Sequence, residues 1–378
     1  MSTRGAQATI DGLSTSDAID VVFVSTSPLS GTYPGGFACR HRDFASAVAR
    51  ERRTHVLYLA PPTVPPAVFD DFPPPASVGA TTVRVDDDGR HPLLPRHCVG
   101  RGLRWPGRNL VVPLTPNVAQ LALSAPRATV VLEEAWERAL PASPRGRLER
   151  ARCRRVYGGL RRAGHPIVAI TEREAAHLGQ HLPNPVTVIP YGVDPTWFAD
   201  RRDGGRGVDV LVIGAVNRDE QQVEGFVRAL RANAATRTAT CAIAGAEPRP
   251  AIAALADERT LVLGYVADVR EQLAAARVVA IPTFTDVGIK TTMLRAWAAA
   301  TPVVAGRAVV GAVRGGERGA VGVASLPDMA DAVGGLLADA RRAEALGAAG
   351  RDLAARDFDA ERSARAFAAL VAATLERT

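Results

Sequence analysis

One lysine stands among the 46 basic residues of this 378-residue chain. That residue, Lys290, lies in the segment PTFTDVGIKTTMLRAWAAATPVV, from Pro282 to Val304. The pattern predicts a strand end, a loop with Gly288, a helix with Lys290 in its first turn, and another strand. Backbone N–H groups and the helix dipole would then point at one place, to which Lys290 adds a full charge. This corner suits a diphosphate, although an ordinary strand-to-helix turn explains the loop equally well.

Two further motifs could do chemistry in the first half of the chain. Gly35 and Gly36 end the loop SPLSGTYPGG after the first predicted strand, where the absence of Cβ lets backbone approach a ligand or simply permits a turn. Glu133 and Glu134 follow another predicted strand and fall at the carboxyl edge of a sheet, where α/β folds bind ligands. Either carboxylate could orient an acceptor hydroxyl or take its proton, and helix capping or a surface position is the alternative.

Metal ligands are not indicated by the residue spacing. The run Asp86–Asp88 precedes Gly89 and is typical of a solvated turn rather than of a metal motif. The seven histidines and four cysteines show no metal-ligand spacing. We therefore expect neither a metal nor a bound cofactor.

The net charge of +7 at pH 7 favours an anionic partner. No nucleic-acid-reading motif accompanies the charge, so we expect no nucleic-acid partner. From Arg145 to Arg162 there are eight arginines and one glutamate, which is typical of a solvated helix face or of a peripheral contact with an anionic membrane. No stretch approaches the ~20 apolar residues of a membrane span, so we expect a cytoplasmic protein. If the arginine-rich helix contacts an anionic membrane, we expect the protein to be peripheral to the inner membrane face.

The elements that must position these residues alternate between strands and helices. Continuous β-branched runs such as IDVVFVST and DVLVIGA predict parallel strands buried on both faces, with helices between them. The fold class expected is α/β, with two Rossmann-like doubly wound domains. The expected divisions are a flexible leader at 1–18, an acceptor-side domain at 19–199, a donor-binding domain at 208–357, and a C-terminal helix at 358–378 that packs back on the first domain.

Several of these motifs together resemble retaining glycosyltransferase family 4, whose members have the GT-B fold. The segment around GIK is similar to the family's donor-site signature, and IPYGVD, AITEREAAHL and LGYVADVREQLAAARVVAIP resemble other family elements in the expected order. The resemblance covers roughly residues 165–305. It implies two facing domains that bind a nucleotide-sugar donor without a metal ion.

The resemblance also implies roles for particular residues. Gly288, Ile289 and Lys290 would hold the donor diphosphate, with the backbone of Tyr265 and Val266 beside the base. Other residues implied near the donor are Gly35 and Gly36 across the cleft, Arg218 as a second cation, and Asp286 near the sugar or in a capping role.

The sequence departs from the family pattern at two positions where the family carries glutamates eight residues apart. Here these positions are Val287 and Arg295. A guanidinium cannot accept a hydrogen bond from a ribose hydroxyl, so Arg295 would pair instead with phosphate or with an acidic sugar.

The resulting prediction is a retaining, metal-independent glycosyltransferase that moves a sugar from a nucleotide diphosphate to a hydroxyl acceptor. The acceptor would be a natural product, a lipid-linked glycan or an envelope glycan. Two alternatives stay open: a non-catalytic glycosyltransferase-like binding protein, and a sugar-nucleotide epimerase with the same two domains.

Overall fold

The computed structural model divides the chain into two compact units. Unit 1 comprises Met1–Pro190 and Ala360–Thr378, and unit 2 comprises Tyr191–Asp359. The structure describes residues 3–29, 36–60, 67–85, 103–114, 118–133, 142–182, 185–194, 196, 207–214, 216, 222–266, 268–285 and 288–377.

Unit 1 is built on parallel strands in two sheets. The first sheet has the order β3-β2-β1-β4 and the second has the order β5-β6-β7. A parallel bridge between Val111 and Ala128 connects β4 with the segment that leads into β5. The strands are β1 (Val21–Ser25), β2 (Thr54–Ala60), β3 (Val78–Arg84), β4 (Leu110–Pro113), β5 (Val130–Glu133), β6 (Ile167–Ala169) and β7 (Val186–Val188).

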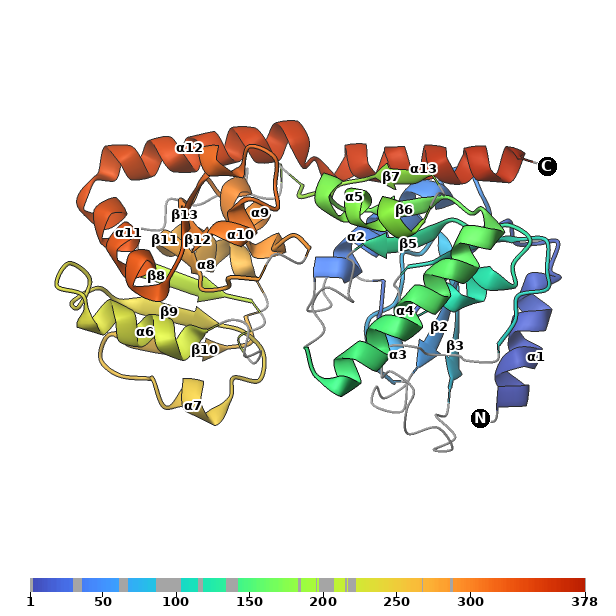
Figure 1. Ribbon diagram of the computed structural model, residues 1–378, viewed down its shortest axis with the longest axis horizontal. Helices are drawn as coiled ribbons and strands as arrows, with labels where there is room; N and C mark the ends of the chain where they lie inside the picture. The colour runs from blue at the N-terminus through green and yellow to red at the C-terminus, as the bar shows by residue number, and fades with distance from the viewer. Residues whose placement is uncertain are drawn as a thin grey trace. The chain divides into compact units, whose positions relative to one another are not determined.

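Helices cover both faces of the unit 1 strands (Figure 1). Alternate residues of β1 enter different cores, since Val22 packs with α1, α4 and α5 while Phe23 packs with α2 and α13. This three-layer arrangement is why every residue of β1 is buried and why its first four residues are all apolar. The helices are α1 (Thr3–Ser14), α2 (Gly36–Ala49), α3 (Ala67–Asp71), η1 (Ala119–Leu123), α4 (Pro144–Ala163), α5 (Glu172–His181) and α13 (Ala360–Glu376).

The first residues of the chain differ from expectation. We expected residues 1–18 to be a flexible leader, but Thr3–Ser14 form helix α1. Ala6 and Ile10, four residues apart on one helix face, are both completely buried in the unit 1 core. The Ser14 carbonyl also lies so close to Gly107 that a Cβ there would be 1.7 Å from its oxygen. Burial of these side chains thus accounts for the ordered helix.

The C-terminal helix α13 packs on the first unit. The rings of Phe44 on α2 and Phe367 on α13 stack with centroids 4.1 Å apart. Phe367 is fully buried, together with Val371 one turn later. An ion pair between Arg50 and Glu361, with nitrogen and oxygen 2.7 Å apart, lies on the exposed side of this contact.

Unit 2 has one parallel sheet in the order β10-β9-β8-β11-β12-β13. This is the doubly wound order in which the sequence direction reverses between β8 and β11. The strands are β8 (Val208–Ile213), β9 (Cys241–Ala244), β10 (Thr260–Gly264), β11 (Ala276–Ile281), β12 (Val303–Gly306) and β13 (Ala320–Val323).

Helices again flank the unit 2 sheet. The core against α6 and α11 contains Phe226, Val333 and the strand residue Ile243. On α9, Trp297 is fully buried and donates its indole N–H to the Gly319 carbonyl at 2.7 Å. The helices are α6 (Val223–Ala232), α7 (Pro250–Ala253), α8 (Val269–Ala275), α9 (Thr291–Ala298), α10 (Arg307–Val310), η4 (Gly316–Arg318), α11 (Leu326–Ala338) and α12 (Ala340–Asp357).

The division between the units lies earlier than the sequence predicted. We expected the first domain to end at residue 199 and the second to begin at residue 208, but unit 2 already begins at Tyr191. The Val193 N–H donates to the Phe358 carbonyl at 2.7 Å, and Val193 forms a parallel bridge with Asp359. This pairing attaches the segment after Pro190 to unit 2. Residues 200–206 lie outside the described ranges.

A carboxylate joins three strands of unit 2 at their amino ends. Asp209 Oδ2 accepts from the Thr240 N–H at 2.9 Å, and Asp209 Oδ1 accepts from Arg277 Nη1 at 2.9 Å. Burial acts to raise the pKa of Asp209, but the hydrogen bonds from Thr240 and Arg277 outweigh it and lower that pKa. The group therefore stabilises the sheet in its ionised form.

Within the described ranges, every helix is too short or too polar to cross a lipid bilayer.

Candidate functional site

The carboxyl ends of the unit 2 strands carry the candidate site. All pairings in this sheet are parallel, so Ile213, Ala244, Gly264, Ile281 and Gly306 end their strands at one edge. Ligands of open α/β sheets bind outside this edge, near the point where strand order reverses. In unit 2 that point lies between β8 and β11, and the loop after β11 leads directly into α9.

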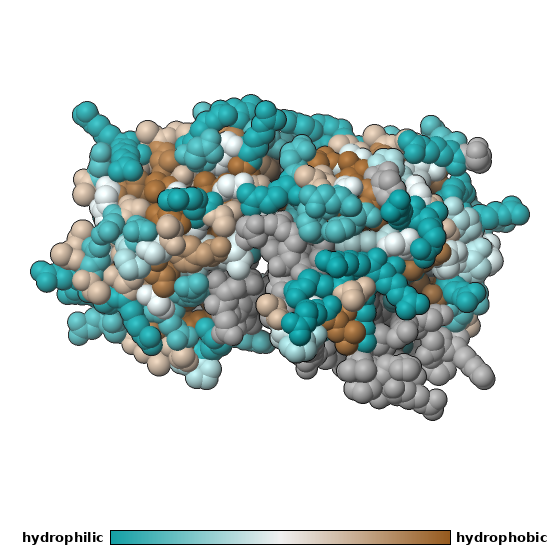
Figure 2. Space-filling model, in the orientation of Figure 1, coloured by the Kyte–Doolittle hydropathy of each residue, from teal (hydrophilic) through white to brown (hydrophobic). Residues whose placement is uncertain are grey.

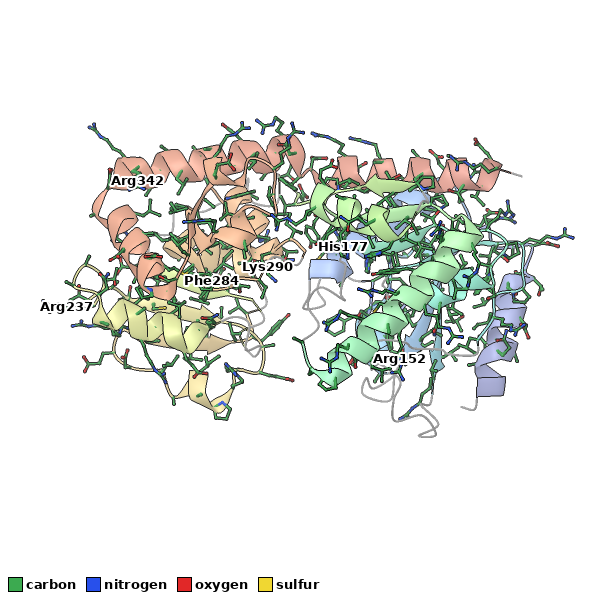
Figure 3. All side chains as sticks on the ribbon, viewed as in Figure 1. Arg152, His177, Arg237, Phe284, Lys290 and Arg342 are labelled. Carbon is green, nitrogen blue, oxygen red and sulfur yellow. The ribbon has the colours of Figure 1, made fainter. Side chains whose placement is uncertain are left out.

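The loop before α9 has the features predicted for an anion site. Gly288 is buried and adopts φ 66°, a conformation that favours glycine. Ile289 is 5% exposed and anchors the loop, while Lys290 is half-buried and is the N-cap residue of α9. Figure 3 labels Lys290 at the start of this helix, near Phe284 in the loop after β11.

The first turn of α9 has an unusual cap. Ser, Thr, Asp and Asn are preferred at an N-cap because their side chains accept hydrogen bonds from the first N–H groups. Lys290 cannot do so, and its side chain makes no cap hydrogen bond. The first turn also has no acidic residue. Within the described ranges, the first turn of α9 thus has neither a side-chain cap nor an acidic residue, and the positive end of its dipole and the nearby Lys290 charge favour an anion.

The face of α9 that carries Arg295 is directed at the end of β8. Thr292 Oγ1 donates to the Ile213 carbonyl at 3.3 Å, which ties the first turn of α9 to that strand. Arg295 is three residues after Thr292 and lies on the same helix face. Its side chain is half-buried. The position that departs from the family pattern thus belongs to the same helix face as the tether to β8.

Close backbone contacts shape the adjoining strand ends. A Cβ at Gly245, just after β9, would lie 2.3 Å from the Gly214 carbonyl oxygen after β8. A Cβ at Gly306 would lie 2.1 Å from the Thr283 carbonyl oxygen. Each distance is below any ordinary carbon–oxygen contact and involves backbone, so only glycine fits. These glycines let neighbouring loops approach at the carboxyl edge.

Thr283 is a candidate that sequence reasoning did not single out. It follows β11 by two residues, is fully buried, and its Oγ1 has no hydrogen-bond partner among the described residues. Buried hydroxyl groups nearly always have a partner, and exceptions concentrate at functional sites or at places that take water or ligand. Its residue type carries no signal, and only its place between Pro282 and the candidate loop could have pointed to it.

Tyr265 and Val266 follow β10 at the same edge. Tyr265 is 53% exposed, unusual for a large aromatic side chain, and Val266 is half-buried. Gly264 before them adopts φ 65°, and its carbonyl accepts from the Gly245 N–H at 2.7 Å. Three strand spacings separate β10 from β11, so the two ends lie about 14 Å apart along the sheet.

The other predicted site residues cannot be placed to the same degree. Gly36 begins α2 and Glu133 ends β5, but the structure describes only the backbone placement of these two residues. The remaining predicted residues lie outside the described ranges altogether: Gly35, Glu134, Arg218 and Asp286. Their proposed roles stay predictions.

Among the described residues, no three His, Cys, Asp or Glu side chains come together as they would around a metal ion.

Comparison with known proteins extends this description of unit 2. Residues 207–339 match the family model described as "Glycosyl transferases group 1". This match covers every strand of the unit 2 sheet and includes Gly288, Lys290 and Arg295. A search of curated proteins finds no match to the chain.

Solved glycosyltransferase structures are similar over almost the whole chain. Sucrose-phosphate synthase from Thermosynechococcus elongatus superposes with a TM-score of 0.73 at 17% identity, covering 95% of this chain and 100% of that one. Anabaena Alr3699/HepE in complex with UDP and glucose gives 0.67 at 14% identity, with 95% and 100% covered. WaaG, a glycosyltransferase involved in lipopolysaccharide biosynthesis, gives 0.66 at 15% identity, with 93% and 99% covered.

The predicted α/β fold of GT-B type is therefore confirmed. At these identities the structural likeness establishes the fold, and the sequence match assigns a group 1 glycosyltransferase domain to unit 2. Together the findings support a glycosyltransferase of GT-B type.

Proposed function

We propose that the chain is a retaining, metal-independent glycosyltransferase that transfers a hexose from a nucleotide diphosphate sugar to a hydroxyl acceptor. The acceptor would be a natural product, a lipid-linked glycan or an envelope glycan. The observation that carries the proposal is the first turn of α9, where Lys290 takes the N-cap position without capping. This arrangement supports binding of a diphosphate by one ammonium and several backbone N–H groups.

The donor would extend from α9 to the end of β10. Its diphosphate would bind at Gly288, Ile289 and Lys290, and its base would lie beside Tyr265 and Val266. A ligand that contacts both places has to span about 14 Å, which favours an extended nucleotide over inorganic phosphate. Because HepE structures contain UDP or UDP-glucose, UDP-glucose is the first donor to test.

Catalysis would rest on stabilising the leaving group. The bond from the anomeric carbon to the diphosphate breaks, and a bond from that carbon to the acceptor oxygen forms. Lys290 and the α9 N–H groups would stabilise the negative charge that develops on the departing diphosphate. Arg218 and Arg295 would add positive charge, Asp286 would lie near the sugar, and Gly35 and Gly36 would let backbone approach the phosphates. Glu133 or Glu134 would accept the acceptor proton.

Turnover with defined donors tests this proposal. We expect release of nucleotide diphosphate from UDP-glucose or another UDP- or GDP-sugar only when an acceptor is present, without added metal and in the presence of a chelator. Proton NMR of the product should show the donor's anomeric configuration. Loss of activity on chelation or an inverted product would contradict the corresponding part of the proposal.

A specific observation favours a second candidate, a non-catalytic nucleotide-sugar-binding protein. Arg295 is half-buried on the helix face tied to β8, where the family resemblance places a ribose-binding glutamate. If ribose recognition is lost there, the protein would bind a phosphate-bearing ligand without transferring sugar. Restoring the carboxylate with Arg295→Glu distinguishes the two candidates. Activity gained only in this variant would favour the binding protein, and activity already present in the natural sequence would exclude it.

We further propose that this cytoplasmic enzyme contacts an anionic membrane through α4. The helix spans 20 residues and is anchored by buried Tyr157 and Leu160. Figure 2 shows hydrophilic side chains along the visible face of α4. Five of its arginines are exposed, namely Arg147, Arg154, Arg155, Arg161 and Arg162. Each arginine near an anionic surface contributes about 1 kcal/mol to binding.

Vesicle sedimentation tests this contact. We expect the protein to pellet with vesicles that contain phosphatidylglycerol and to stay in solution with neutral phosphatidylcholine vesicles. The double change Arg154→Gln and Arg155→Gln should release it, whereas the matched change Arg341→Gln and Arg342→Gln on unit 2 should not. Equal release by both pairs would show that only net charge matters and would remove α4 from the proposal.

A further inference from the structure

The outer strands of the sheets differ in how well they are protected against pairing with another chain. An outer strand presents backbone N–H and C=O groups along one side, and proteins commonly blunt such an edge by a short strand or a bulge. In unit 2, β13 has four residues, and β10 has a register shift between Val262 and Gly264. In unit 1, β7 has three residues. These three edges are therefore poor templates for a further strand.

Strand β3 has neither kind of protection in the part of the chain that the structure describes. It has seven residues and pairs with β2 in an unbroken parallel register along its whole length. It is the last strand of its sheet and lies outside β2 (Figure 1). The side chains of Ala80 and Thr82, in the middle of the strand, are exposed. A long, regular and exposed edge of this kind is a template for strand pairing.

The pairing with β2 decides which backbone groups of β3 face outward. The Val85 N–H, just after β3, donates to the Ala60 carbonyl of β2 at 3.0 Å. Because backbone groups point alternately to the two sides of a strand, the odd-numbered residues of β3 bond to β2, whereas Ala80 and Thr82 point away from it. Within the described ranges, neither residue has a backbone hydrogen bond to another segment. Each thus presents one N–H and one C=O at the outer edge.

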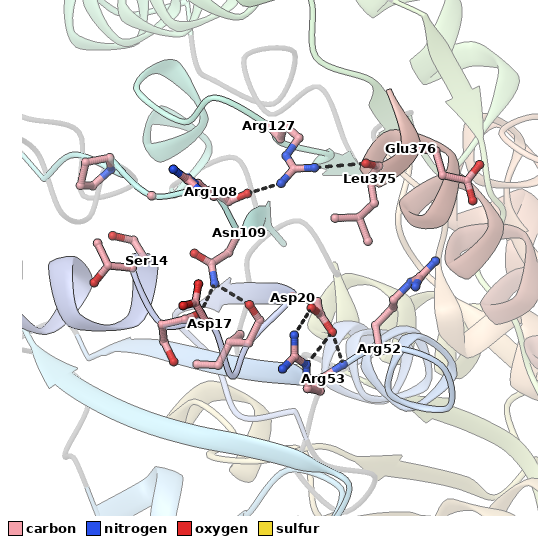
Figure 4. A pocket seen from close by; sticks show the side chains of 15 residues that line it. Ser14, Asp17, Asp20, Arg52, Arg53, Arg108, Asn109, Arg127, Leu375 and Glu376 are labelled. Carbon is pink, nitrogen blue, oxygen red and sulfur yellow. Dashed lines mark hydrogen bonds and ion pairs between the residues drawn. The ribbon is translucent and has the colours of Figure 1, made fainter. Parts of the chain in front are cut away.

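The amino ends of the same sheet differ, because polar groups there are paired with one another. A pocket of about 780 Å³ lies beside the starts of β1, β2 and β4 (Figure 4). In its wall, Arg53 Nη2 lies 2.7 Å from Asp20 Oδ1, and Arg127 donates to the carbonyls of Leu375 at 3.1 Å and Arg108 at 2.6 Å. These contacts tie α13 and the strands of unit 1 together. The outward groups of β3 are therefore the stronger candidate for a partner.

We propose that β3 pairs with β3 of a second copy of this chain, antiparallel about a two-fold axis through Thr81. Ala80 of each copy then lies opposite Thr82 of the other, and the two residues exchange both of their N–H···O=C hydrogen bonds. The outward groups of Ala80 and Thr82 in both copies are all used. Pairing of one surface with itself about a two-fold axis is the commonest symmetry of protein oligomers. The interface is independent of the proposed transfer reaction.

The side chains of β3 suit pairing of the strand with itself. The small side chains of Ala80 and Thr82 face each other on the exposed side. Arg84, the charged residue of β3, lies opposite Val78 of the other copy. The two copies of Arg84 are then about 20 Å apart, at roughly 3.3 Å per residue. Like charges at that distance are largely screened at physiological salt. A second copy therefore meets no opposing charge and extends the sheet of the first.

Sedimentation equilibrium of the full chain from about 1 to about 200 µM tests the proposal. We expect reversible dimerisation that is weak, because few hydrogen bonds offset the cost of association. Thr82→Pro removes an outward N–H and keeps every hydrogen bond to β2. It should raise the dissociation constant of the dimer at least about tenfold. The matched control is Thr82→Ala, which keeps the N–H and should leave the dissociation constant unchanged.

Amide hydrogen exchange of the wild-type protein gives a second measurement that does not depend on folding of the proline variant. The N–H groups of Ala80 and Thr82 should exchange more slowly at the highest concentration than at the lowest, whereas the Thr81 N–H, which bonds to β2, should be slow at both. A monomer over the whole range would overturn the proposal. A dimer that Thr82→Pro leaves unchanged, equal weakening by Thr82→Ala, or exchange at Ala80 and Thr82 that is independent of concentration would also overturn it.

Discussion

Replacing Thr283 by valine should make the protein more stable and a worse binder of its donor. The Thr283 hydroxyl is fully buried and has no hydrogen-bond partner in the part of the chain that the structure describes. An unsatisfied buried polar group costs about 1–3 kcal/mol. Valine replaces that hydroxyl by a methyl group of similar size. We expect the free energy of unfolding of unit 2 to rise by about 1 kcal/mol, and its melting temperature to rise by roughly 2–4 °C.

The same change should weaken donor binding if the nucleotide diphosphate accepts a hydrogen bond from the Thr283 hydroxyl. Loss of a hydrogen bond to a charged group costs about 1.5–3 kcal/mol, which is roughly a tenfold or greater rise in Kd. Scanning calorimetry without ligand and titration with UDP-glucose measure the two effects. Thr301→Val is the matched control, because Thr301 is equally buried but donates to the Leu273 carbonyl at 2.9 Å, so its replacement should destabilise.

Two results would refute this reasoning about Thr283. A destabilised Thr283→Val protein would show that the hydroxyl has a partner in the folded protein. A stabilised protein with unchanged donor affinity would show that the hydroxyl is a packing defect outside the binding site. A rise in stability together with weaker binding is the trade-off expected of a residue kept for function.

Three further changes test the structural basis of the account. Phe367→Ala should cost unit 1 about 3–5 kcal/mol by removing a fully buried ring stacked on Phe44, and a loss below 1 kcal/mol in urea unfolding would argue against docking of α13. Gly245→Ala should destabilise unit 2 in thermal melts, since its Cβ would lie 2.3 Å from a backbone oxygen, whereas Gly179→Ala, with open space around it, should not. Asp209→Asn should destabilise at neutral pH but lose its effect in acid. The folded-state pKa of Asp209 is lowered, so its contribution to the free energy of unfolding is full above the unfolded-state pKa of about 3.9. That contribution disappears as the pH falls through the folded-state pKa. Urea unfolding at several pH values measures this dependence.

Much of the fold could be predicted because central parallel strands are buried on both faces. Runs such as Val21–Ser25 and Val208–Ile213 are apolar almost throughout and are recognisable without any partner. The strands missed were β3 and β13, which lie at sheet edges. In β3, Val78 and Val83 are buried while most residues between them are exposed, so no continuous apolar run marks it.

The N-terminal helix was missed for a related reason. Among the described side chains of this helix, Ala6 and Ile10 are the only fully buried apolar ones, and Leu13 is partly buried. Buried Ser14 is polar, so the apolar positions are too few to give a clear helical period in a polar segment. Contact with the core of unit 1, rather than local preference, forms this helix.

The candidate site was only partly predictable. Lys290 and Gly288 stood out by residue type. Gly288 lies in the loop before α9 as expected, whereas Lys290 is the N-cap residue of α9 rather than a residue of its first turn. Thr283 and Gly245 could not be found in this way, because their importance comes from burial and from the approach of a neighbouring backbone segment. Such properties depend on which segments the fold brings together.

Direct titration of the protein with nucleotide sugars tests the central claim, that a nucleotide diphosphate binds where Lys290 meets the start of α9. We predict that at least one UDP- or GDP-sugar binds the wild-type protein, and that Lys290→Ala weakens it at least about tenfold while the exposed Arg237→Ala on the same unit leaves it unchanged. Equal affinity of the wild-type and Lys290→Ala proteins, or no binding by any of these sugars, would contradict the account.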